Sequence, residues 1–122
     1  MPPLHILLID DEEDFVQTLA ERLALRNMQV ETATDGAAGL RLFQIQSFHA
    51  VVLDLLMPGL GGLAVLEQMK ALKPHIPVIL LTGHGDTADG RRGLDLGASD
   101  YLMKPVDIED LIEKIRAAAA IS

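Results

Sequence analysis

The sequence predicts a doubly wound α/β domain, in which helices cover both faces of a five-stranded parallel sheet. Two observations favour this fold class. Short apolar runs alternate along the chain with segments in which apolar residues recur at helical spacing. The strongest runs are continuously apolar, as expected for strands that are buried on both faces, and such strands are typical of parallel sheets.

The first half of the chain contains three of the expected strands. Residues 4–9 form a continuous apolar run, and the helix expected after it carries apolar residues at positions Phe15, Val16, Leu19 and Leu23. A weaker strand is expected at residues 29–33, followed by a less regular helix near residues 37–43. The third strand, residues 50–53, is again continuously apolar.

The second half repeats the alternation. The helix expected after the third strand carries apolar residues at positions Val65, Leu66, Met69 and Leu72. The fourth strand is expected at residues 77–81 and the fifth at 101–103, with a less regular helix near residues 87–96 between them. A final helix is predicted by apolar residues at positions Ile108, Leu111, Ile112 and Ile115.

Length and charge limit the function classes. At 122 residues, we expect a single domain, residues 1–122, with its own core. The net charge of -8 disfavours direct nucleic-acid binding by this domain, because affinity for phosphate backbones comes largely from Lys and Arg. The chain contains no cysteine, no signal-peptide pattern and no apolar run of membrane-spanning length, so we expect a cytoplasmic location and no membrane contact.

Reactive side chains follow four of the five expected strands. The first strand runs into Asp10 and Asp11, the third into Asp54, the fourth into Thr82 and the fifth into Lys104. Because the carboxyl ends of parallel strands meet at one edge of a sheet, we expect these residues to form a single site.

Asp54 is an isolated charge inside an apolar segment. A structural ion pair with Lys104 is one interpretation. The other is a metal site, since three converging carboxylates would repel one another unless a cation lay between them. Oxygen ligands favour a hard divalent ion, and Mg²⁺ fits best. The three carboxylates of Asp10, Asp11 and Asp54, one Mg²⁺ ion and Lys104 would together carry no net charge.

The acidic run at residues 10–14 has two further interpretations. Acidic groups at the start of a helix complement the helix dipole, which accounts for Glu12, Glu13 and Asp14 without any ligand. An EF-hand loop is excluded because Phe15 stands where the sharp turn of such a loop requires glycine.

A buried, ionised aspartate beside a metal is suited to nucleophilic attack on phosphorus, which forms an aspartyl phosphate. In this hypothesis Asp54 is the phosphoryl acceptor, Lys104 and the metal offset charge on the transferring oxygens, and Thr82 donates a hydrogen bond to one of them. The reaction requires no general base.

Four segments closely resemble the receiver domains of two-component response regulators. They are Leu-Ile-Asp10-Asp11-Glu, Val-Leu-Asp54-Leu-Leu-Met-Pro-Gly, Leu-Leu-Thr82-Gly and Asp-Tyr-Leu-Met-Lys104-Pro. The resemblance covers essentially the whole chain and implies a flavodoxin-like fold with strand order 2-1-3-4-5. It also implies a signalling domain that catalyses only its own phosphorylation and dephosphorylation.

The resemblance further implies roles for single residues. Asp11 and Asp54 would bind Mg²⁺ directly, Asp10 through a water molecule, and Leu56 through its backbone carbonyl. Thr82 and Tyr101 would be a switch pair that alters the face formed by the fourth helix, fifth strand and fifth helix. A half-buried packing role is the alternative for Tyr101.

The implied phosphoryl donor is a phosphohistidine on a sensor histidine kinase or a histidine phosphotransfer protein. The output partner or output domain, and a phosphorylation-dependent homodimer, stay open.

The peptide bond between Lys104 and Pro105 is expected to be cis. Leu56 stands where the family often has a polar side chain, and the side chains of Leu56 and His84 would control how long the phosphoryl group persists. Gly61 stands where the family often has Asp.

Two rival functions remain. Gly83, Gly85 and Ala88 fit a dinucleotide-binding pattern, with Asp107 about 20 residues further on, although too little chain follows for a second nucleotide-binding half. The other rival is a receiver-like interaction module that never takes a phosphoryl group.

Two glycines are expected inside the fourth helix, Gly90 and Gly93. Each should weaken it by about 1 kcal/mol relative to Ala. We expect a marginal helix that shifts when the switch pair changes state. The alternative is that Gly90 relieves packing.

Overall fold

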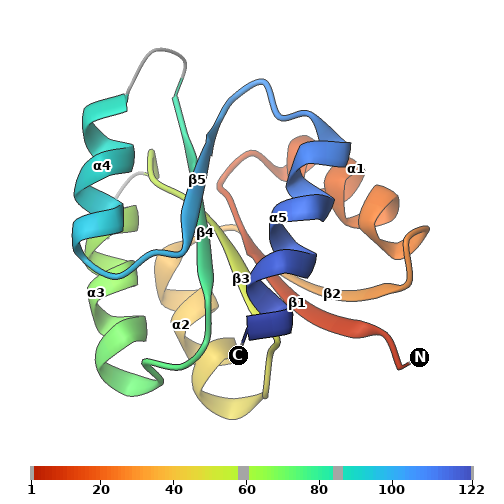
Figure 1. Cartoon of the computed structure of the whole chain (residues 1–122), viewed down its shortest axis with the longest axis horizontal. Helices are drawn as coiled ribbons and strands as arrows, with labels where there is room; N and C mark the ends of the chain where they lie inside the picture. The colour runs from red at the N-terminus through yellow and green to blue at the C-terminus, as the bar shows by residue number, and fades with distance from the viewer. Residues whose placement is uncertain (1, 58–60, 84–86, 122) are drawn as a thin grey trace.

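The computed structural model describes residues 2–57, 61–83 and 87–121, and His84 and Gly85 lie outside these ranges. Strands and helices alternate along the described chain (Figure 1). The strands are β1 (Leu4–Ile9), β2 (Met28–Ala33), β3 (Ala50–Asp54), β4 (Val78–Thr82) and β5 (Asp100–Met103). The helices are α1 (Glu13–Ala24), α2 (Gly36–Ile45), α3 (Gly62–Leu72), α4 (Thr87–Asp95) and α5 (Ile108–Ile121).

The strands form one parallel sheet in the order β2-β1-β3-β4-β5. The predicted α/β class and the implied strand order are both confirmed. The predicted strand limits differ by one residue at several ends. In particular, Asp54 and Thr82 are the last residues of β3 and β4, so they are held by the sheet and do not merely follow it.

The helices cover both faces of the sheet (Figure 1). On one face, α1 and α5 pack on a cluster that includes Leu8, Val52 and Leu111; on the other face, α2 and α3 pack on a cluster that includes Leu7, Leu53 and Leu66. Each central strand therefore buries successive side chains on opposite faces, which explains its continuously apolar sequence.

One residue of a predicted apolar face is placed differently. Leu72 shares the helical spacing of Val65, Leu66 and Met69, but it is the last residue of α3 and is 48% exposed. The apolar contacts of this helix come from Val65, Leu66 and Met69, which are fully buried.

The two glycines of α4 lie close to the sheet. A Cβ atom on Gly90 would lie 2.6 Å from the ring of Tyr101 in β5, and one on Gly93 would overlap the side chain of Leu80 in β4. This close approach supports the packing explanation for Gly90 and extends it to Gly93. Whether the helix is also marginal stays a prediction.

Within the described residues, none of the helices combines the length and apolar character needed to cross a lipid bilayer.

Candidate functional site

The sheet brings together the side chains that the sequence placed at the strand ends. Ile9 pairs with Leu53 across β1 and β3, so Asp10 leaves β1 directly beside the end of β3. Asp54 pairs with Leu81, which puts Thr82 one residue further along the adjacent strand. Lys104 follows β5 at the same edge, where its N–H donates to the Thr82 carbonyl.

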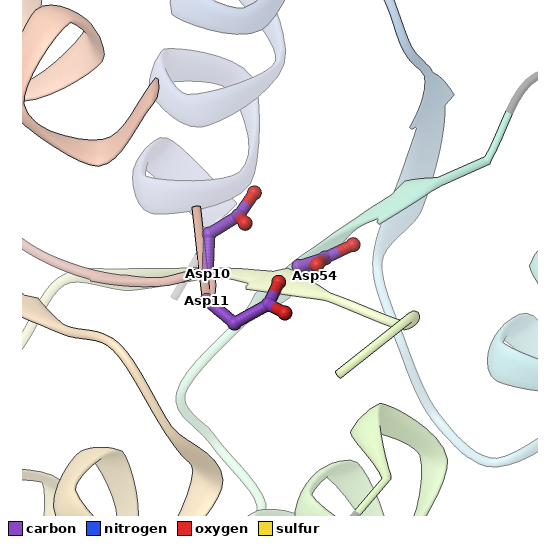
Figure 2. A group of neighbouring side chains, drawn as sticks. All are labelled: Asp10, Asp11 and Asp54. Carbon is purple, nitrogen blue, oxygen red and sulfur yellow. The ribbon is translucent and has the colours of Figure 1, made fainter. Parts of the chain in front are cut away.

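Asp10, Asp11 and Asp54 form a compact carboxylate cluster (Figure 2). One oxygen from each lies within 4.8 Å of the others. Asp10 and Asp54 are buried, at 0% and 2% exposed, while Asp11 is exposed. The cluster therefore has two buried carboxylates and one that opens towards solvent.

Two backbone N–H groups orient the buried carboxylates. The N–H of Glu12 donates to Asp10 Oδ1 at 3.0 Å, and the N–H of Leu56 donates to Asp54 Oδ1 at 3.2 Å. Both bonds span two residues, a local arrangement typical of aspartate at the start of a turn. Each carboxylate is thus held by the loop that follows its own strand.

In the part of the chain that the structure describes, Lys104 is the cation that contacts the carboxylates of the site. Its Nζ lies 2.8 Å from Asp10 Oδ2, 3.1 Å from Glu12 Oε1 and 3.8 Å from Asp54 Oδ1. Burial alone would lower the pKa of Lys104, but its carboxylate partners outweigh burial and raise that pKa above the ordinary value of 10.5. Lys104 therefore stays charged throughout the physiological range.

Asp54 is strained electrostatically. Burial, reinforced by the charge of Asp10, raises the pKa of Asp54 from 3.8 to about 6, although Lys104 and the Leu56 N–H act in the opposite direction. At neutral pH the carboxylate is ionised in surroundings that disfavour its charge. A further cation close to Asp54 would relieve this cost.

The donor set fits a divalent cation. Asp10 Oδ2 is buried and, among the described residues, receives no well-directed hydrogen bond, although Lys104 contacts it as an ion pair. A buried oxygen with spare acceptor capacity, beside two more carboxylates, is the ligand chemistry that Mg²⁺ prefers. The residues present therefore fit the expected metal.

Thr82 and Tyr101 lie on neighbouring strands. Thr82 is fully buried, and its hydroxyl donates over 3.5 Å to the Leu102 carbonyl, which is a weak hydrogen bond. Tyr101 is half-buried against the core and faces Gly90 of α4. The half-buried packing role considered for Tyr101 is confirmed, and its role as a switch stays a prediction. The Lys104–Pro105 peptide is cis, as expected.

Two residues of the site were not recognised as such from the sequence. Glu12 was interpreted through the helix dipole, and Phe15 as an apolar helix residue that excludes an EF-hand loop, but both contact Lys104. No local pattern indicates these contacts, because Lys104 is 92 residues away from Glu12.

Comparison with known proteins agrees with this geometry. The family model described as "Response regulator receiver domain" matches residues 6–116. The chain belongs to the response regulator receiver domain family. It is therefore a signalling domain of the kind found in two-component systems. This assignment favours the receiver interpretation over dinucleotide binding.

The chain matches curated relatives along about half of each relative's length. An uncharacterized transcriptional regulatory protein of Bacillus subtilis, YkoG, is 40% identical over 114 residues, which are 93% of this chain and 50% of the relative. The response regulator MprA of Mycobacterium sp. (strain KMS) is 37% identical over 115 residues, which are 94% of this chain and 50% of the relative. The receiver domain thus spans about half the length of these relatives.

Solved structures have the same fold. A response regulator receiver domain protein from Clostridium thermocellum has a TM-score of 0.92 and 38% identity, over 97% of this chain and 95% of that one. The receiver domain of NtrX from Brucella abortus also has a TM-score of 0.92, with 31% identity over 96% of this chain and 99% of that one.

Proposed function

We propose that Asp54 accepts a phosphoryl group in a Mg²⁺-dependent reaction. The observation that carries this proposal is the juxtaposition of a buried aspartate, two further carboxylates within 4.8 Å and a lysine ammonium at 3.8 Å. A structural ion pair requires one carboxylate and one cation, whereas a cluster of three carboxylates, Asp54 among them, accompanies Lys104 here. Two of the three carboxylates are buried, and among the described residues Lys104 is the one cation paired with them, so the site lacks positive charge.

The proposed step forms one bond and breaks another. A carboxylate oxygen of Asp54 attacks phosphorus and forms a P–O bond, the P–N bond of the donor phosphohistidine breaks, and its electron pair goes to the imidazole nitrogen. The Leu56 N–H orients the attacking carboxylate. Lys104 and the Thr82 hydroxyl would contact the transferred phosphoryl oxygens.

In this proposal Asp11, Asp54 and the Leu56 carbonyl would hold Mg²⁺ directly, and Asp10 would hold it through water, as the family resemblance implies. When bound, the ion would offset negative charge on the transferring group. The exposed Leu56 side chain reaches towards Gly83, where an added Cβ would lie 2.6 Å from Leu56 Cδ1. We propose that this apolar side chain restricts the approach of hydrolytic water to Asp54. His84, the second residue expected to affect the phosphoryl lifetime, lies outside the described residues.

The decisive experiment is intact-mass spectrometry after incubation with Mg²⁺ and acetyl phosphate. We expect a mass gain of one phosphoryl group in the wild type and none in Asp54→Ala. Labelling that persists in Asp54→Ala would contradict the proposal, as would a wild type that is never labelled. The second outcome would favour a phosphorylation-independent interaction module.

We further propose that phosphorylation draws the Thr82 hydroxyl towards the phosphoryl group, turns Tyr101 inward and alters the α4–β5–α5 face. The contact of Tyr101 with Gly90 supports this link between the site and α4. Hydrogen exchange checks it: amides of residues 87–97 should exchange differently once beryllofluoride and Mg²⁺ are bound. Equal protection in both states would exclude the shift.

The proposed partners follow from the family. The donor would be a sensor histidine kinase or a histidine phosphotransfer protein, and the location cytoplasmic. Since one relative is described as a transcriptional regulatory protein, the altered face would act on an output domain or partner, or form a phosphorylation-dependent homodimer.

A further inference from the structure

Lys104 is placed towards α1 and away from Asp54. Its ammonium lies 2.8 Å from Asp10 and 3.1 Å from Glu12, both within hydrogen-bonding distance, but 3.8 Å from Asp54 Oδ1. The same Nζ lies 4.6 Å from the centroid of the Phe15 ring. Three of these four neighbours belong to the loop after β1 and the first turn of α1. Of the three carboxylates paired with Lys104, that of the proposed phosphoryl acceptor lies farthest from the ammonium.

Glu12 uses its side chain for Lys104 and not for the helix. It occupies the N-cap position of α1, but its side chain makes no capping hydrogen bond. Ser, Thr, Asp and Asn are the residues that cap helices well, and Glu is not among them. The Glu12 carboxylate instead accepts a hydrogen bond from Lys104.

Phe15 contributes a second attraction. The ammonium lies within the distance at which a cation is attracted to the face of an aromatic ring. Because the ring itself packs against the core cluster under α1 and α5, it is a fixed surface for the lysine. Phe15 therefore favours a position of the Lys104 ammonium on the side of the site where Glu12 lies.

We propose that Glu12 and Phe15 are positioning residues that hold Lys104 in a resting position, which competes with its engagement of a phosphoryl group on Asp54. This inference rests on the proposed function. It goes beyond it by naming the contact that must break before Lys104 can act.

Burial determines which contact breaks. In the resting position the Lys104 ammonium donates to Glu12 and lies beside Asp10 as an ion-pair partner, so it must move towards Asp54 to reach a phosphoryl group there. Asp10 is completely buried, so losing its cation would be costly, whereas the Glu12 side chain is 66% exposed and can be rehydrated. Lys104 should therefore keep Asp10 and exchange Glu12 for the phosphoryl oxygens.

The test compares beryllofluoride affinity, with Mg²⁺ present, among variants of the first turn of α1. Glu12→Gln removes the charge, whereas Glu12→Asp keeps the charge but shortens its reach to Lys104. We expect both to bind beryllofluoride about 2- to 5-fold more tightly than the wild type, as the loss of an exposed ion pair allows. The matched control is Glu13→Gln, which removes the same charge from an exposed neighbour and should leave the affinity unchanged.

Nuclear magnetic resonance tests the resting position without metal or phosphoryl mimic. Protons next to the Lys104 ammonium should be shifted upfield by the Phe15 ring in the wild type and in Phe15→Tyr, but not in Phe15→Leu. Addition of Mg²⁺ and beryllofluoride should reduce this shift in the wild type. A role of Phe15 in packing alone would leave the Lys104 resonances of the free protein unchanged by Phe15→Leu.

The outcomes separate the two levels of the proposal. Glu12→Asp could bind beryllofluoride as the wild type does while Glu12→Gln binds it more tightly. In that case the Glu12 charge acts by repelling the anion and not by competing for Lys104, and the inference is wrong. It is equally wrong if Lys104 shows no ring-dependent shift. If the wild type shows that shift but binds no beryllofluoride, the proposed function fails, and the competition fails with it.

Discussion

The surroundings of Asp54 disfavour the ionised form of its carboxyl group. Its carboxylate is 2% exposed and shares the edge of the sheet with Asp10, so folding brings together two charges that water separates in the unfolded chain. Lys104 compensates them only in part, since it lies 1.0 Å closer to Asp10 than to Asp54, at 2.8 and 3.8 Å. The remaining cost is the physical reason why this residue should attract a cation and react with a phosphoryl donor.

Replacing Asp54 by Asn should therefore stabilise the metal-free protein at neutral pH. The folded-state pKa of Asp54 is raised from 3.8 to about 6, so the folded protein binds this proton more tightly than the unfolded chain. The wild type then loses stability as pH rises between these values. We expect Asp54→Asn to be more stable by about 1–3 kcal/mol at pH 7 and no more stable near pH 3.

Urea unfolding at the two pH values, with a chelator present, measures this difference. Glu67→Gln is the control, because Glu67 is exposed on α3 and its neutralisation should change stability little at either pH. A destabilised Asp54→Asn at pH 7 would show that Lys104 stabilises the charge more than burial opposes it.

In α4, the helix propensity of the sequence and the packing of the helix on the sheet have opposite requirements. Gly90 and Gly93 lower its intrinsic helix propensity, yet both lie where the helix backbone approaches β4 and β5. The close approach lets α4 lie directly against Tyr101 and Leu80. Packing against the sheet has therefore outweighed propensity in this element.

Gly93→Ala separates these two effects. Helix propensity alone predicts a gain of about 1 kcal/mol. The added methyl group would overlap Leu80, which is fully buried, so we expect a net loss of about 1–3 kcal/mol in the free energy of unfolding. Gly61→Ala is the matched control, since nothing lies within 4 Å of a Cβ atom there, and its cost should stay below about 1 kcal/mol. A stabilised Gly93→Ala would mean that α4 can move away from β4.

For the molecule as a whole, one parallel sheet gathers the chemistry at a single edge. Residues from β1, β3, β4 and β5 reach the site because their carboxyl ends share that edge. The chain carries a net charge of -8, and the carboxylate cluster is a local excess of that charge. A divalent cation should therefore bind the folded protein and not the unfolded chain.

Mg²⁺ should accordingly stabilise the whole domain. At a concentration of about 100 times its dissociation constant, it should add about 2.7 kcal/mol to the free energy of unfolding. Thermal unfolding with increasing MgCl₂, at constant ionic strength, measures this as a saturating rise in Tm. Asp11→Asn should reduce the rise, because Asp11 is the exposed carboxylate of the cluster. An equal rise in Asp11→Asn would place the ion elsewhere.

Much of the site could be predicted because its residues interrupt strong local patterns. Asp54 stands out as a charge after four apolar residues, and Asp10 and Lys104 stand out in the same way at the ends of their strands. The exposure of Leu72 does not follow from its helical spacing, because this residue ends α3 and is 48% exposed although the helix buries Val65, Leu66 and Met69. The functions of Leu56 and His84 were expected from family resemblance alone and stay predictions.

The sequence by itself determined the alternation of strands and helices, because buried strands and amphipathic helices each have a local period. It also determined which reactive residues end the strands. Only the tertiary structure decided that Lys104 meets Glu12 and Phe15, and that Gly93 touches Leu80. Those contacts join residues far apart in the chain, and they depend on the order of the strands and the distance between layers, which no local period encodes.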